Sequence, residues 1–135
     1  MDNKLIGDLL PKAKKHLQWY INYSTHVVEL YLFILNQEKV RDRANMLLGP
    51  DHEEIRFRLD ELSRDCSILL RLIEIVEDAF DKAPSEHTSR AIQRFADAFA
   101  AYQVKMRAID GKVRLLMKRF ACLDQMGIIS QSEIE

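Results

Sequence analysis

A chain of 135 residues is long enough for one domain, and one of this size buries about two thirds of its unfolded surface. Its 20 lysines and arginines stand against 21 acidic residues, and the net charge of -1 excludes the globally basic composition typical of nucleic-acid-binding proteins. With 47% hydrophobic and 30% charged residues, the composition is that of an ordinary globular protein.

Targeting signals and cysteine frameworks are missing from the sequence. Cys66 and Cys122 fall on separate predicted helices, and no CxxC pair suggests a secreted scaffold. The first residues contain no long apolar run behind a basic start, so we expect no signal peptide. The most apolar stretch, VVELYLFIL at 27–35, is shorter than the about 20 residues that span a bilayer. We therefore expect a cytoplasmic protein without membrane contact.

The first predicted helix covers residues 9–48. Gly49 suits the left-handed position after a helix, and Pro50 cannot continue one. One apolar stripe on this helix consists of Leu17, Ile21, Ser24, Val28, Tyr31 and Leu35. A second stripe consists of Trp19, Tyr23, His26, Leu30, Phe33, Val40, Ala44 and Leu47. Two stripes on one helix predict two packing partners.

The second and third predicted helices cover residues 52–81 and 86–125. Asp51, followed three residues later by Glu54, resembles a capping box at the start of the second helix. Ser85 is positioned to cap the third helix, and Gly127 is expected to end it, leaving 128–135 as a polar tail.

Both of these helices carry an apolar seam in alternating steps of three and four residues. In the second helix the seam is Ile55, Leu59, Leu62, Cys66, Leu69, Ile73, Val76 and Phe80. In the third helix it is Ile92, Phe95, Phe99, Tyr102, Met106, Ile109, Val113, Leu116, Phe120 and Leu123, with Gly111 facing outward. Such seams are typical of coiled-coil packing, and short turns favour antiparallel neighbours. We predict a single all-α domain over residues 1–135, an elongated up-down-up antiparallel three-helix bundle.

Apolar residues beyond the seams predict a further surface. With turns centred near residues 50 and 84, Leu30 is expected level with Leu70 and Ala98. Apolar surplus from all three helices then coincides at one waist, where a wide internal core is the alternative to an exposed patch. An exposed patch with a thin alanine face favours a homodimer. The candidate interface residues are Trp19, Tyr23, Leu30, Phe33, Ile68, Leu72, Ile75 and Ala101.

Charges gather at both ends of the predicted bundle. Lys12, Lys14 and Lys15 are expected near Glu74, Glu77, Asp78 and Asp81. The other end is expected to be locally basic, since the start of the second helix offers Arg56 and Arg58 and no matching line of acids. Its candidate anion contacts are Lys105, Arg107, Lys112, Arg114, Lys118 and Arg119. Pairing and solubility are the usual roles of such charges, and no free aromatic platform accompanies them.

The sequence contains no pattern typical of catalysis. It has no glycine-rich phosphate loop, no GxSxG and no paired Glu-x-x-His. His16, His26, His52 and His87 fall at different levels, and we expect His26 to have a packing role. Glu74 and Glu77 have the spacing for a divalent ion but lack a second acidic pair. We expect no enzyme activity, no cofactor and no metal.

Two functions remain after these exclusions. The leading prediction is a non-enzymatic protein–protein interaction or assembly protein, adaptor-like or chaperone-like, that acts as a homodimer and holds another protein of unknown identity. The alternative is a small nucleic-acid-associated regulator that uses the basic end. The two differ in salt dependence, because phosphate contacts weaken steeply as salt rises.

Overall fold

The computed structural model describes residues 3–82 and 86–128, with side chains from residue 7 onward. These residues form helices and no strand: α1 (Asn3–Leu35), α2 (Glu38–Arg41), α3 (Ala44–Leu48), α4 (His52–Asp81) and α5 (Glu86–Gln125). The predicted all-helical class is confirmed. The bounds of α4 and α5 agree with the predicted helices 52–81 and 86–125.

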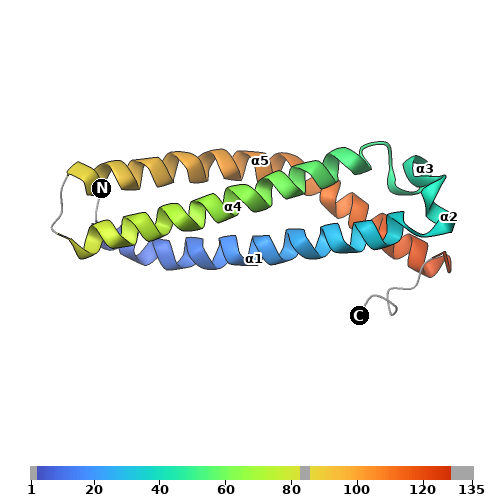
Figure 1. Ribbon diagram of the computed structural model, residues 1–135, viewed down its shortest axis with the longest axis horizontal. Coiled ribbons are helices and arrows are strands. Elements are labelled where there is room, and N and C mark those ends of the chain that lie inside the picture. The colour runs from blue at the N-terminus through green and yellow to red at the C-terminus, as the bar shows by residue number, and fades with distance from the viewer. Residues whose placement is uncertain (1–2, 83–85, 129–135) are drawn as a thin grey trace.

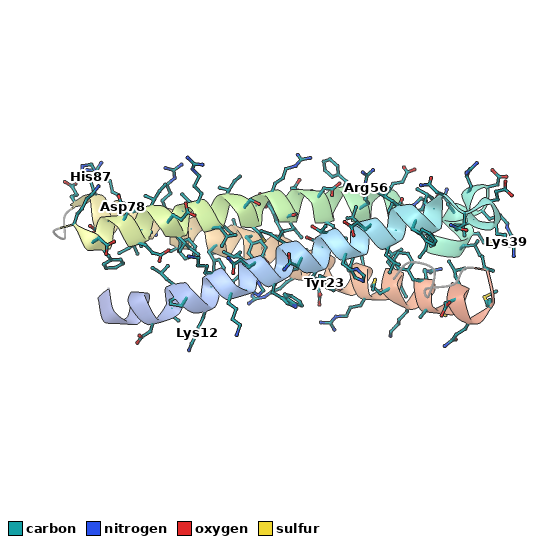
Figure 2. The ribbon with its side chains drawn as sticks, turned by 60° about the horizontal axis from the view of Figure 1, so that its bottom comes forward. Lys12, Tyr23, Lys39, Arg56, Asp78 and His87 are labelled. Atoms are coloured by element: carbon teal, nitrogen blue, oxygen red, sulfur yellow. The ribbon has the colours of Figure 1, made fainter. Side chains whose placement is uncertain are left out.

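Three long helices lie side by side (Figure 1). The starts of α1 and α5 and the end of α4 lie at one end, whereas α2, α3 and the start of α4 lie at the other. Figure 2 shows Asp78 and His87 at the first of these ends and Lys39 at the second. Helix α4 packs against both α1 and α5. No helix in the described part of the chain is both long and apolar enough to cross a bilayer.

The seams of α4 and α5 form the core that their spacing predicted. Seven of the eight predicted α4 residues are buried, from Ile55 to Val76, and Phe80 packs partly buried against them. Of the ten predicted seam residues of α5, six are buried: Tyr102, Ile109, Val113, Leu116, Phe120 and Leu123. Ile92, Phe95, Phe99 and Met106 are partly buried on the same core. Gly111 faces open space, as predicted.

The buried stripe of α1 differs from both stripes predicted for it. It contains Leu10, Leu17, Tyr20, Ser24, Val27, Tyr31 and Ile34, with Leu30 beside it. Three of these residues belong to the first predicted stripe and Leu30 belongs to the second, but four belong to neither: Leu10, Tyr20, Val27 and Ile34. The apolar arc of α1 is so wide that periodicity alone does not identify its centre. Ser24 tolerates burial because its hydroxyl donates to the Ile21 carbonyl oxygen at 3.1 Å.

Helix α1 ends at Leu35, so the predicted single helix over 9–48 is wrong. The backbone of Gln37 is extended, and the short helices α2 and α3 follow before Gly49. Val40 and Leu48 are buried and anchor these two helices on the core. Gly49 has a φ of 94°, in the region that favours glycine. The predicted capping box is also wrong, because the Asp51 side chain makes no capping hydrogen bond.

The two extra short helices change the register of α1 against α4. Tyr31 meets His52, and Lys14 lies 3.7 Å from Glu77. Leu30 is therefore level with the first turns of α4 and not with Leu70, which overturns the predicted waist where α1 is concerned. The apolar excess of VVELYLFIL instead packs within the chain: Val27, Leu30, Tyr31 and Ile34 are buried, and Val28, Leu32, Phe33 and Leu35 pack partly buried against the core.

The predictions for the start and the end of α5 have different outcomes. The predicted cap at Ser85 and the polar tail beyond Ile128 lie outside the described residues. Gly127 follows the end of α5 with a φ of 73°, as expected for a glycine after a helix.

Candidate interaction surface

A groove runs along α4 and α5 beside their buried seam. The α4 wall repeats in steps of three and four residues from Glu54 to Ile75, through Arg58, Glu61, Asp65, Ile68 and Leu72. The α5 wall follows the same rule from Ala91 to Lys112, through Arg94, Ala98, Ala101, Lys105 and Ala108. Residues at this spacing share one face of a helix, so the groove is a second stripe adjacent to the core stripe.

One half of the groove exposes apolar side chains to solvent, and Arg90 and Arg94 of α5 border its hollow beside Ile75. Ile68 is 58% exposed and Ile75 is 47% exposed, although both are branched aliphatic side chains. The hollow beside Ile68 is bordered on α5 by Ala98 and Ala101. Because alanine is small, α5 is thin here and leaves room for another side chain.

The other half of the groove is charged around an apolar floor. Ile55, Leu62 and Ile109 line this hollow of about 260 Å³, and charged side chains surround it. Lys105 Nζ lies 3.2 Å from Asp65 Oδ2 and 3.7 Å from Glu61 Oε1. Lys112 Nζ lies 3.8 Å from Asp51 Oδ2. The start of α4 therefore does offer acids to α5, contrary to the expectation of a locally basic end.

The six candidate anion contacts therefore differ in whether they form ion pairs. Lys105 and Lys112 pair with α4, and Arg114 pairs with Asp110 on its own helix. The guanidinium of Arg119 lies half-buried beside Gly49. Within residues 7–82 and 86–128, no ion pair involves Arg107 or Lys118, and both are exposed. At the opposite end, the predicted attraction between lysines and acids is present as Lys14–Glu77.

The eight candidate interface residues differ in their exposure to solvent. Leu30 and Leu72 are only 5% and 7% exposed, so their assignment to a partner surface is wrong; the closeness of α4 to its neighbours buries them. Phe33 is partly buried on the core. The α4–α5 groove contains three more of the candidates, Ile68, Ile75 and Ala101, and all three are exposed.

Trp19 and Tyr23 belong to an aromatic cluster between α1 and α5. Their rings stack at 5.2 Å with an interplanar angle of 11°, and Trp19 is 57% exposed. Tyr20 meets Tyr102 of α5 edge-on at 5.8 Å, and His16 Nε2 lies 3.0 Å from the Tyr102 hydroxyl. Figure 2 shows Tyr23 midway along α1. These side chains join α1 to α5, and only Trp19 is left largely open.

The buried polar groups satisfy one another and offer little chemistry. His52, which the apolar spacing did not identify, is buried between Tyr31 and Asn45, whereas His26 is exposed and not packed as predicted. Burial raises the pKa of the Cys66 thiol to about 11, so it is protonated near neutral pH and a poor nucleophile. Among the described residues, no three histidine, cysteine, aspartate or glutamate side chains are placed to hold a metal ion.

Comparison with protein-family models, with curated proteins and with solved structures gives no match for this chain.

Proposed function

We propose that this chain is a cytoplasmic, non-enzymatic protein–protein interaction or assembly protein, adaptor-like or chaperone-like in its role. In this proposal its three long helices act as an elongated up-down-up antiparallel bundle with coiled-coil-like seams, and it functions as a homodimer. The observation that carries the proposal is the face of α4 and α5. Exposed Ile68 lies there beside Ala98 and Ala101, and exposed Ile75 lies beside Ala91, Arg90 and Arg94.

The exposed apolar side chains on these two helices form a pattern. On α4, Phe57, Ile68 and Ile75 are separated by eleven and seven residues, which is about three and two helical turns, so they point in one direction. On α5, Val104 and Leu115 are exposed and again eleven residues apart. Aligned rows of this kind on rigid helices are typical of binding surfaces, whereas single exposed apolar residues are common on any protein.

Burying the exposed side chains of this face would favour association. Full burial of one isoleucine or phenylalanine side chain contributes about 1.5–3 kcal/mol, and this gain opposes the loss of translational and rotational freedom on binding. Phosphate binding receives less support, because Lys105, Lys112 and Arg114 are already engaged by carboxylates.

The test compares two arginine substitutions that differ by one position. Ile68→Arg puts a charge into the face, and Ser67→Arg puts the same charge on an exposed neighbour about 100° away around the helix. We expect the wild-type chain and Ser67→Arg to self-associate and to retain the same proteins from the native host extract, and Ile68→Arg to lose both properties. If Ile68→Arg, still helical by circular dichroism, behaves like Ser67→Arg in both assays, the proposed function is wrong.

A further inference from the structure

We propose that the occupant of the α4–α5 face is a second copy of this chain, related by a two-fold axis parallel to the helices. In this arrangement α4 of each copy lies against α5 of the other, and the two helices in contact are antiparallel. The inference rests on the proposed function and specifies both its partner and the geometry of contact. It follows from three complementary features that the face contains within one chain.

The register between α4 and α5 determines which residues a second copy would meet. The Thr88 hydroxyl donates to the Ala79 carbonyl oxygen, and Lys105 bridges to Asp65. These contacts show which residues of the two helices are level. A two-fold axis parallel to the helices leaves every level unchanged, so a residue of α4 meets the residues of the second copy's α5 that are level with it in its own chain.

Size is the first complementary feature. Ile68 lies level with Ala101, because both line one hollow. Phe57 lies level with Ala108, which lines a hollow together with Glu54 and Arg58 on either side of Phe57. At these two levels the large side chain is on α4 and the small one on α5, whereas the exposed Val104 and Leu115 of α5 lie at other levels. Placing α4 on α5 of the second copy fits large against small, as in the knobs-into-holes packing of helices.

Charge is the second feature. Arg71 lies eight residues before Ala79 on α4, and Asp97 lies nine residues after Thr88 on α5, so the two are level. Both are exposed, and in the described parts of the chain neither takes part in an ion pair. Asp97 accepts only the Gln93 amide, at 2.8 Å. In the proposed dimer Arg71 of each copy meets Asp97 of the other, which gives two symmetric charge pairs.

Self-complementarity is the third feature and favours a second copy over an unrelated helix. An isologous interface requires that one surface contain both members of each contacting pair. The α4–α5 face does so for Ile68 with Ala101 and for Arg71 with Asp97. A two-fold axis perpendicular to the helices would instead bring α4 against α4. With that axis at the level of Ile68, Arg64 and Arg71, which flank Ile68, would face each other as like charges.

Charge reversal in separate chains tests the arrangement. In a dimer of Arg71→Glu, the new glutamate of each copy faces Asp97 of the other, and in a dimer of Asp97→Arg the new arginine faces Arg71. Because both arrangements place like charges together, each variant dimer should have a dissociation constant at least about tenfold higher than the wild type in sedimentation equilibrium. An equimolar mixture should recover the dimer, because both pairs then have opposite charges. Glu74→Arg and Arg107→Glu, at exposed positions turned away from the face, should neither weaken association nor prefer each other.

Several outcomes separate this inference from the proposed function. A wild-type chain that is monomeric at high micromolar concentration overturns the inference and the homodimer, yet the proposed adaptor-like role survives if Ile68→Arg still loses a protein that the wild type retains. The arrangement of α4 on α5 is overturned if either single charge-reversal variant dimerises like the wild type, or if the equimolar mixture of the two fails to recover the dimer. If a charge reversal loses helicity by circular dichroism, Ile68→Arg mixed with Ala101→Glu provides the same cross-test, with Ser67→Arg and Ala100→Glu as controls.

Discussion

His52 joins three helices through two hydrogen bonds. Its Nε2 lies 2.8 Å from Asn45 Oδ1, and its Nδ1 lies 2.7 Å from the Tyr31 hydroxyl oxygen. Tyr31 is on α1, Asn45 on α3 and His52 at the start of α4. The buried His52 ring thus links the start of α4 to α1 and α3.

His52→Leu should decrease the free energy of unfolding by about 1–3 kcal/mol, because the Tyr31 hydroxyl is left buried without a partner. Urea denaturation followed by circular dichroism measures the change. His87→Leu, at an exposed position, should change it by less than about 0.5 kcal/mol. Equal effects of the two substitutions would show that the His52 hydrogen bonds contribute nothing to stability.

The two cysteines differ in environment and should differ in reactivity. Cys66 is buried and Cys122 is exposed, and both are free. Iodoacetamide should label Cys122 alone in the native protein and both residues in denaturant, as measured by mass spectrometry. Labelling of Cys66 at the rate of Cys122 under native conditions would contradict its burial in the seam. An intramolecular disulfide between the two would contradict the register of α4 against α5.

Burial also predicts an alkaline limit to stability. It raises the pKa of Cys66 from 9.0 to about 11, and it raises the pKa values of Tyr20 and Tyr102 as well. Above pH 9 the unfolded chain loses protons that the folded chain retains, so the free energy of unfolding should decrease as pH rises from 9 to 11. Cys66→Ala should make that decrease shallower in urea denaturation. An unchanged slope would exclude a contribution from Cys66.

At the scale of helices, predictability depended on how narrow the apolar stripe was. The seams of α4 and α5 are narrow, and their spacing identified both the helices and the buried side chains. Helix α1 is apolar over a wide arc, so its buried centre at Tyr20 and Val27 was not identified. Its end at Leu35 is marked by neither glycine nor proline, and for that reason the break before α2 was missed.

On α4 a buried seam residue and an exposed residue are adjacent in sequence, and substituting each in turn tests this assignment. Leu69→Ala should cost roughly 2–5 kcal/mol in the free energy of unfolding, because Leu69 is buried and its truncation leaves a cavity. Ile68→Ala, one position away and 58% exposed, should cost less than about 1 kcal/mol in dilute solution. Equal costs in urea denaturation would mean that the border lies elsewhere.

At the scale of the whole molecule, the candidate surface was predicted in part. Ile68, Ile75 and Ala101 were identified because they are apolar or small and lie off the seam. Leu72 has the same signal but is buried, since its exposure depends on how closely α5 approaches. Phe57, Val104 and Leu115 were missed, although their positions off the seam were readable. The match of Arg71 with Asp97 requires the register between α4 and α5, which only the structure provides.

Cysteine cross-linking between copies tests the central claim, that the α4–α5 face binds a second copy, most directly. In a Cys122→Ser background, one chain carries Ile68→Cys and another carries Ala101→Cys, and the two are mixed under mild oxidation. A disulfide requires Cα atoms within about 7 Å, so a covalent dimer should form in the mixture and much more slowly in either variant alone. The exposed neighbours Ser67→Cys and Ala100→Cys serve as the matched pair and should give little product. A mixture that yields no covalent dimer, or no more than the matched pair, would contradict the claim.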